Sequence, residues 1–173
     1  MEKFSAVILL APFALFGVSS CAEDTAETAK SDTYFTVTGD VSLPMVEARA
    51  SIVKLGGKIP AMTISSTSAA IKKFGSSYGA NLFFSNDFTP KPGTYPIEFG
   101  YRNRKDTLGG SFTQRRGMFS HDTKGTAEFI EFGDKVKVVF EFQSFNGNDK
   151  KADRKMVTVK GEAVCDCPYT DIF

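Results

Sequence analysis

The chain contains no tryptophan, one histidine and only three cysteines among its 173 residues. This shortage argues against a structural zinc site, which usually needs four ligands. The single histidine, His121, lies between Ser120 and Asp122. Members of a catalytic triad converge from separate parts of a fold, so three consecutive residues do not form one. We therefore interpret His121 as a polar loop residue, and we predict no catalytic residue, no metal and no cofactor.

An excess of charge of one sign is also missing. Lys and Arg total 21 and Asp and Glu total 20, which gives a formal net charge of +1. Proteins that bind nucleic acid normally carry a clear basic excess, so we expect no nucleic-acid partner. The sequence also lacks a nucleophile elbow, a phosphate-binding loop and a dinucleotide fingerprint. The polar segment 146–154 lacks the spacing of an EF-hand, and we interpret it as a solvated loop.

The apolar run near the N-terminus is too short for a membrane-spanning helix. It extends from Phe4 to Val18 and is interrupted by Pro12, whereas a spanning helix needs about 20 apolar residues. Lys3 precedes this run, and small residues lead from it to Cys21. A charged start, a short apolar stretch and small residues before a cleavage site are typical of an export signal.

The segment Val18-Ser19-Ser20-Cys21 resembles the lipobox of bacterial lipoproteins, which has a branched residue three places before the cysteine and a small residue directly before it. The resemblance implies that residues 1–20 are a cleaved signal peptide and that Cys21 carries a diacylglycerol and a fatty acid such as palmitate. Ala22 follows the cysteine, which by analogy favours the outer membrane of the cell envelope, facing the periplasm or the surface. The alternative is an ordinary secretory signal, with Cys21 an ordinary cysteine.

The composition changes again after the cysteine. Residues 21–32 are mostly small or acidic and include no bulky apolar side chain. Such a segment cannot bury enough surface to fold, so we interpret it as a flexible tether that carries the lipid. Residues 33–173, with the first strand expected near Tyr34, have the length of one domain.

Seventeen phenylalanines, together with Val, Ile and Tyr, favour strands over helices. Short runs of alternating apolar residues recur between turn residues, and these predict eight or nine strands. The expected strands are 34–38, 46–53, 59–64, 81–85, 95–101, 110–119, 126–132, 135–145 and 156–164. We predict an all-β antiparallel β-sandwich, with an up-and-down barrel as the alternative and at most one short helix near 67–74.

The strongest local signal is a hairpin whose turn is Gly133-Asp134. On its second arm, alternate side chains belong to Val136, Val138, Phe140 and Phe142, and we expect these to face the core. Lys137 lies on the opposite face of that arm.

Several runs are similar to strands of small uncharacterised bacterial lipoproteins with β-sandwich domains. These runs are 125–130, 136–142 and 157–161, and the turn Pro92-Gly93-Thr94-Tyr95 fits the same pattern. The resemblance implies a fold but no activity.

Two cysteines, Cys165 and Cys167, remain for the folded domain. In a regular strand their Cα atoms would lie about 6.6 Å apart, near the upper limit for a disulfide. A local disulfide would therefore need a turn, which Pro168 would permit. Two free thiols, a bridge to another chain or two ligands of a metal are the alternatives.

Basic residues on two expected strands would form an anionic-ligand patch beside Tyr101 and Phe112 if those strands pair. Its members are Arg102, Arg104, Lys105, Arg115 and Arg116. Such a patch would meet the phosphate or carboxylate groups of a glycan or a lipid headgroup. The alternative is a solvated sheet face, with Asp106 nearby.

These observations favour a non-enzymatic envelope lipoprotein whose β-domain binds a partner, such as an envelope protein or a glycan. The alternative is a barrel that carries a lipid or another small ligand in a cavity lined by Phe99, Phe140 or Phe142. An enzyme would need a cleft where His121 or paired carboxylates converge.

Overall fold

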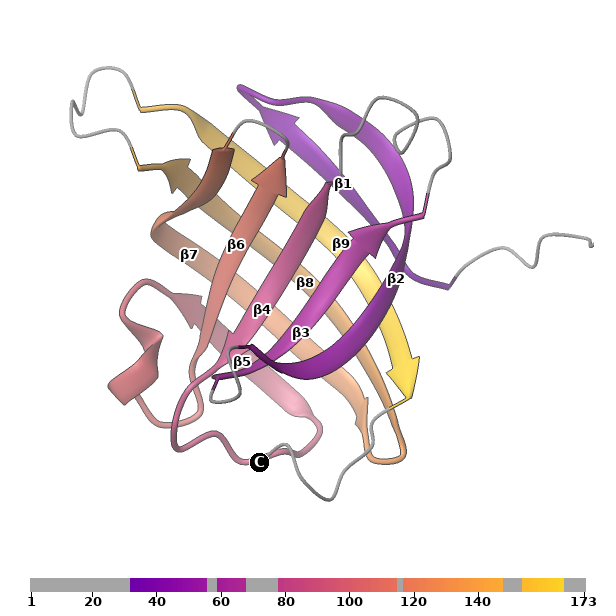
Figure 1. Ribbon diagram of the computed structural model, residues 1–173. Helices are drawn as coiled ribbons and strands as arrows, with labels where there is room; N and C mark the ends of the chain where they lie inside the picture. Colours follow the sequence, from indigo (N-terminus) through magenta and orange to yellow (C-terminus); the bar gives the residue numbers. More distant parts are fainter. Residues whose placement is uncertain (1–31, 56–58, 68–77, 115–116, 148–153, 167–173) are drawn as a thin grey trace, which may run out of the picture.

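Strands make up most of the residues that the computed structural model describes, which are 32–55, 59–67, 78–114, 117–147 and 154–166 (Figure 1). In chain order they are β1 (Tyr34–Gly39), β2 (Leu43–Leu55), β3 (Ile59–Ser66), β4 (Gly79–Phe84), β5 (Gly93–Glu98), β6 (Leu108–Gln114), β7 (Gly117–Phe132), β8 (Lys135–Asn146) and β9 (Met156–Asp166). One turn of 3-10 helix, η1 (Tyr101–Asn103), lies between β5 and β6. The all-β prediction is confirmed.

The strands form one sheet that closes in a ring. The order around the ring is β1-β2-β3-β4-β6-β5-β7-β8-β9, and β9 pairs with β1. Neighbouring strands are antiparallel, except that β5 and β6 share a single parallel pair, Ile97 with Leu108. Because β9 pairs with β1, neither strand is left with an unpaired edge. Unpaired edges are the places where strands of different molecules associate. The ring is barrel-like, and it departs from up-and-down order where β5 and β6 exchange places.

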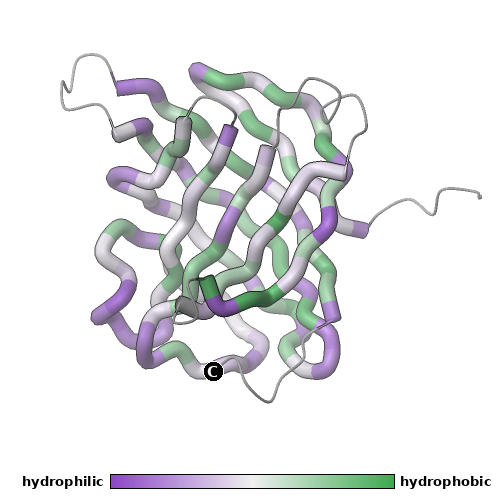
Figure 2. The backbone as a smooth tube through the Cα atoms, in the orientation of Figure 1, coloured by the Kyte–Doolittle hydropathy of each residue, from purple (hydrophilic) through white to green (hydrophobic). Residues whose placement is uncertain are grey.

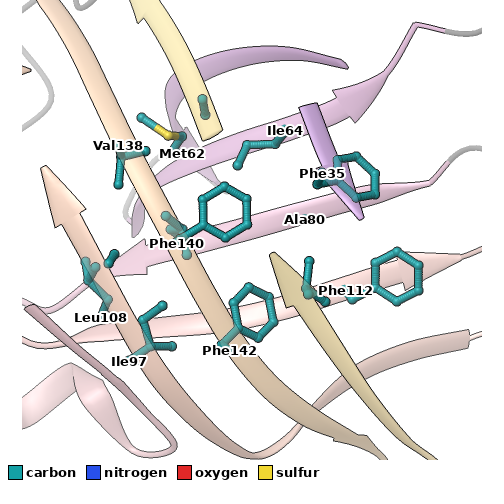
Figure 3. Packing of buried hydrophobic residues seen from close by; sticks show 14 of the residues in the cluster. Phe35, Met62, Ile64, Ala80, Ile97, Leu108, Phe112, Val138, Phe140 and Phe142 are labelled. Carbon is teal, nitrogen blue, oxygen red and sulfur yellow. The ribbon is translucent and has the colours of Figure 1, made fainter. Parts of the chain in front are cut away.

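Aromatic side chains fill the interior of the ring. Figure 2 shows hydrophobic and hydrophilic residues alternating along the strands, as the two faces of a half-buried sheet require. Figure 3 shows Phe140 and Phe142 of β8 pointing into the same space as Phe35 of β1 and Phe112 of β6. The ring centroids of Phe35 and Phe112 are 6.4 Å apart, and those of Phe140 and Phe142 are 6.2 Å apart.

A second group of rings packs near one end of the sheet. Phe84 lies 4.7 Å from Phe88 between ring centroids, and Phe129 lies 4.9 Å from Phe132. Tyr95 joins this group through Phe88, at 4.8 Å. Edge-to-face and tilted arrangements of this kind are the favoured geometries of aromatic pairs.

The predicted hairpin at Gly133-Asp134 is confirmed. It joins β7 to β8, with Phe132 paired to Val136. The side chains expected to face the core are all buried, namely Val136, Val138, Phe140 and Phe142. Alternation therefore identified the inner face of this arm correctly.

Several of the expected strands are wrong in their extent. The expected strand 110–119 is the end of β6 and the start of β7, which form a hairpin there. The expected strand 95–101 stops at Glu98, where β5 ends. Pro60, which we expected at a strand start or edge, is the second residue of β3 and pairs only with β2.

Other expectations fall on residues outside the described ranges, or largely so. These are the signal peptide 1–20, the tether 21–32 except for Asp32, and the helix near 67–74 except for Thr67. The first described strand begins at Tyr34, where the first strand was expected. Among the described residues there is no helix with the length and apolar character needed to cross a membrane.

Candidate functional site

A gap in the pairing of β6 with β7 creates the most distinctive surface feature of the domain. The two strands pair only from Phe112 with Phe119 to Gln114 with Gly117. Beyond Phe119, β7 becomes irregular in its register with β8 and then pairs with β5 from Lys124 onward. β5 is thus inserted where β6 and β7 separate, and register irregularities of this kind often accompany binding sites.

The chain after β5 covers this gap. Gly100 adopts a φ of 78°, which turns the backbone away from the strand direction at low cost because glycine has no Cβ. The following turn is closed by the Arg104 amide, which donates to the Tyr101 carbonyl at 3.0 Å. The Phe99 amide donates to the Thr123 carbonyl of β7 at 2.9 Å. The turn is therefore tied to the sheet on the side of β7, and Figure 1 shows it projecting from the ring near the start of β6.

Thr123 reconnects the separated strands through its side chain. Its hydroxyl donates to the Gly110 carbonyl of β6 at 3.1 Å. The same hydroxyl lies 2.9 Å from the Ser144 hydroxyl of β8. Both side chains are buried, so these bonds satisfy polar groups that would otherwise be costly to bury.

Two pairs of stacked rings lie at the opening, and three of the four rings, those of Phe83, Phe99 and Tyr101, line it. Phe99 is 58% exposed, which is unusual for this side chain, and it stacks on His121 with ring centroids 6.1 Å apart. Tyr101 stacks on Phe83 of β4 at 6.0 Å. Tyr101 also lies directly against Gly109, where an added Cβ would come within 2.4 Å of the ring.

These rings and the backbone between them enclose a groove of about 430 Å³, called the aromatic groove below. Its volume lies within the range of about 300–1,000 Å³ that is typical of small-molecule sites. Its lining consists of Phe83, Glu98, Phe99, Gly100, Tyr101, Arg102, Asn103, Gly109, Gly110, Ser120 and Thr123.

The charges around the aromatic groove are not balanced. Glu98 forms an ion pair with Arg104, so the carboxylate of the lining is already partnered. Arg102 is exposed, lines the groove and takes part in none of the ion pairs found between described residues. The groove therefore presents a cation without an opposing carboxylate.

The described residues of the predicted basic patch do not lie on two neighbouring strands, as was expected. Arg102 lies in η1, and Arg104 and Lys105 lie in the turn that follows. Arg115 and Arg116 are outside the described residues, and β6 separates them in sequence from the turn. Of the two aromatic residues expected beside the patch, Tyr101 lines the groove, whereas Phe112 is buried in the core.

Asp106 holds the base of this turn. Its carboxylate accepts a hydrogen bond from the Thr89 amide at 2.7 Å. That hydrogen bond is the largest cause that lowers the pKa of Asp106, and the nearby Lys105 and Lys91 lower it further. Asp106 therefore has a defined structural role, which is to hold Thr89 through this hydrogen bond.

His121 is exposed, but it lies in β7 and not in a loop, paired with Phe145 of β8. Its ring is held between Phe99 and Gly147, where an added Cβ would approach the imidazole to 2.9 Å. The neighbouring Asp122 has a φ of 48° and forms an ion pair with Arg154. No sequence pattern indicated that His121 and Phe99 would meet.

The residues expected to line an internal cavity are not brought together. Phe140 and Phe142 are buried in the core, at 2% and 0% exposure, whereas Phe99 lies in the aromatic groove. Cys165 is buried on β9 opposite Val136, and Cys167 lies outside the described residues. Cys21 also lies outside them, so both the disulfide and the lipid attachment remain predictions.

A larger groove of about 610 Å³ lies outside β1, β2, β8 and β9. Its charged residues include Lys137 and Glu162, which form an ion pair at 2.8 Å. The hydrogen bond from Lys137 to Glu162 is the main cause that raises the pKa of that lysine. Lys137 and Glu162 are thus already partnered, and the one aromatic residue among the described residues that line this groove, Tyr34, is half-buried, whereas Phe99 is 58% exposed. We therefore regard the smaller aromatic groove as the better candidate.

Comparison of the chain with protein-family models, with curated proteins and with solved structures finds no match in any of the three.

Proposed function

We propose that the protein is a lipoprotein of the bacterial cell envelope whose β-domain binds a partner without catalysing a reaction. The observation that carries this proposal is the exposed Phe99 ring, which stacks on His121 at the mouth of the aromatic groove. A large aromatic side chain left exposed beside a charged rim is typical of recognition surfaces. The partner in this proposal is an envelope protein or a glycan.

The anchoring part of the proposal depends on the lipobox resemblance of Val18-Ser19-Ser20-Cys21. One acyl chain gives only reversible membrane binding, whereas two or more hold a protein stably. Anchored through Cys21, the domain would be connected to the membrane by about ten residues and would remain close to it. The outer membrane is the proposed location, by analogy with lipoproteins that have no aspartate after the cysteine.

The packing of the interior favours partner binding over the ligand-carrying barrel. Rings such as Phe35 and Phe112 contact each other across the space that a carried ligand would need (Figure 3). Close-packed protein interiors leave few voids larger than a water molecule. A surface groove is therefore the more suitable place for a ligand.

The binding part can be tested in intact cells by photocrosslinking. Phe99 is replaced with a benzophenone-bearing phenylalanine, and the same group is placed at Ile130 as a control. Ile130 is also exposed, at 52%, but does not line the groove. We expect adducts to an envelope component from position 99 and none from position 130. No adducts, or equal adducts from both positions, would contradict the proposal.

A further inference from the structure

We propose that the aromatic groove binds a carboxylate-bearing saccharide, with the sugar ring on Phe99 and the carboxylate on Arg102. This assignment deepens the proposed function, because it rests on the groove being the binding surface and names the class of ligand.

The aromatic part of the groove suits a sugar ring. A pyranose has a face of C–H groups, which carry slight positive charge, and the face of an aromatic ring carries slight negative charge. The Phe99 ring is more than half exposed and is supported from one side by His121. Tyr101 is held between Phe83 and the Cα of Gly109, so it forms a second, firmly placed wall. Rigid aromatic surfaces bind with little loss of side-chain entropy.

The polar part of the groove suits hydroxyl groups around such a ring. Asn103 and Ser120 line the groove and supply amide and hydroxyl groups. The Thr123 hydroxyl is already engaged with Gly110 and Ser144, so it belongs to the framework. An apolar face bordered by hydrogen-bonding groups is the pattern that an amphipathic ring requires.

The charge of the groove selects an acidic sugar over a neutral one. Glu98 is neutralised by Arg104, while Arg102 faces the groove with no ion pair among the described residues. A guanidinium matches a carboxylate with two parallel hydrogen bonds. The Arg102 carbonyl accepts from the Asn86 amide at 3.1 Å, which fixes the backbone that presents this side chain.

The test measures binding by titration calorimetry of detergent-extracted full-length protein. The ligands are a tetrasaccharide of α-1,4-linked galacturonate and its neutral counterpart of α-1,4-linked galactose, which has the same stereochemistry but no carboxylate. We expect the wild-type protein to prefer the acidic saccharide, with an affinity that weakens as salt screens the ion pair. Phe99→Leu, which keeps apolar surface but removes the flat ring, should weaken binding of both saccharides by about tenfold.

Arg102→Gln should abolish the preference by weakening binding of the acidic saccharide about tenfold while leaving the neutral one unchanged. Ile130→Ala is the control and should bind like the wild type. The assignment is overturned if the acidic saccharide does not bind, or if Arg102→Gln keeps the preference. It is equally overturned if a single-stranded oligonucleotide, or a soluble lipid-headgroup anion such as glycerol phosphate, binds more tightly. Failure here together with photocrosslinks from position 99 would reject the saccharide alone, whereas absence of those crosslinks would reject the proposed function.

Discussion

At the scale of single residues, stability depends on which face of a strand a side chain occupies. Phe140 is 2% exposed, and its ring tip fills the space left by Gly161, where an added Cβ would lie 2.7 Å away. Phe140→Ala should therefore create a cavity and lower the free energy of unfolding by about 3–5 kcal/mol. This is a large part of the roughly 5–15 kcal/mol that stabilises a typical domain. Chemical denaturation measures the loss.

The matched control is Val139, the residue directly before Phe140 in the same strand. Val139 is 41% exposed on the outer face of β8, so Val139→Ala should change stability by only about 0.5 kcal/mol. Lys137→Ala, on the same outer face, removes a partly exposed ion pair and should also have a small effect. Equal losses for Phe140→Ala and Val139→Ala would contradict the assignment of the inner face.

Asp106 provides a residue-scale prediction about pH. The hydrogen bond from Thr89 lowers the pKa of its carboxyl, so the charged form is favoured in the folded state. The stabilisation is therefore fully present above the unfolded pKa of about 3.9 and is lost as the pH falls through the lower folded pKa. The Thr89 amide proton shift should follow this titration in NMR spectra, with a midpoint below about 3.9.

Asp106→Asn is the matched variant for this titration. The amide keeps an oxygen that accepts from Thr89 but cannot ionise, and asparagine tolerates the left-handed φ of 49° at this position. The acid-dependent shift of the Thr89 proton should therefore disappear. A shift that persists in the variant would mean that another group titrates.

At the scale of elements, the seam between β5 and β6 is the weakest join of the ring. It consists of one parallel pair, whereas β8 pairs with β9 from Lys135 through Phe145. Regions with few ladder hydrogen bonds open more readily than the core strands. Amides of the segment from Phe99 to Lys105 should therefore exchange with deuterium faster than those of β8. Slower or equal exchange in that segment would show that the seam is firmly closed.

The elements also show what the sequence can and cannot predict. Clean alternation over residues 135–145 predicted β8, its inner face and the hairpin before it. The same reasoning extended the strand after Gly93 to Tyr101, because Tyr95, Ile97, Phe99 and Tyr101 alternate. β5 instead ends at Glu98. Gly100 was the available signal, since a glycine within an alternating run often marks a turn or a bulge.

The aromatic groove was only partly predictable. Arg102, Arg104 and Lys105 were expected near Tyr101 because the four residues are neighbours in the chain. It could not show that Phe83, Phe99 and His121 would gather around them, because that depends on the insertion of β5 between β6 and β7. Neither the parallel pair of β5 with β6 nor the exchanged order of these two strands leaves a local pattern in a single sequence.

At the scale of the whole molecule, attachment to the membrane should depend on one sulfur. Cys21→Ser removes the thiol that the lipobox resemblance assigns to acylation. The variant should take up no labelled fatty acid and should either leave the membrane fraction or accumulate as uncleaved precursor. Cys165 lies in the folded domain, so the Cys165→Ser variant should still incorporate the label. Absence of label in the wild-type protein would contradict the lipoprotein assignment.

If the domain meets its partner at the aromatic groove, backbone amides there should be protected when the protein is in its native envelope, and hydrogen exchange measures this protection. Exchange is compared between envelope-bound protein and the same protein extracted in detergent. We expect slower exchange in the envelope for amides of residues 99–103 and 120–123, which line or adjoin the groove. Unchanged exchange there, or slowing confined to the opposite side of the ring at β1, β2 and β9, would contradict it.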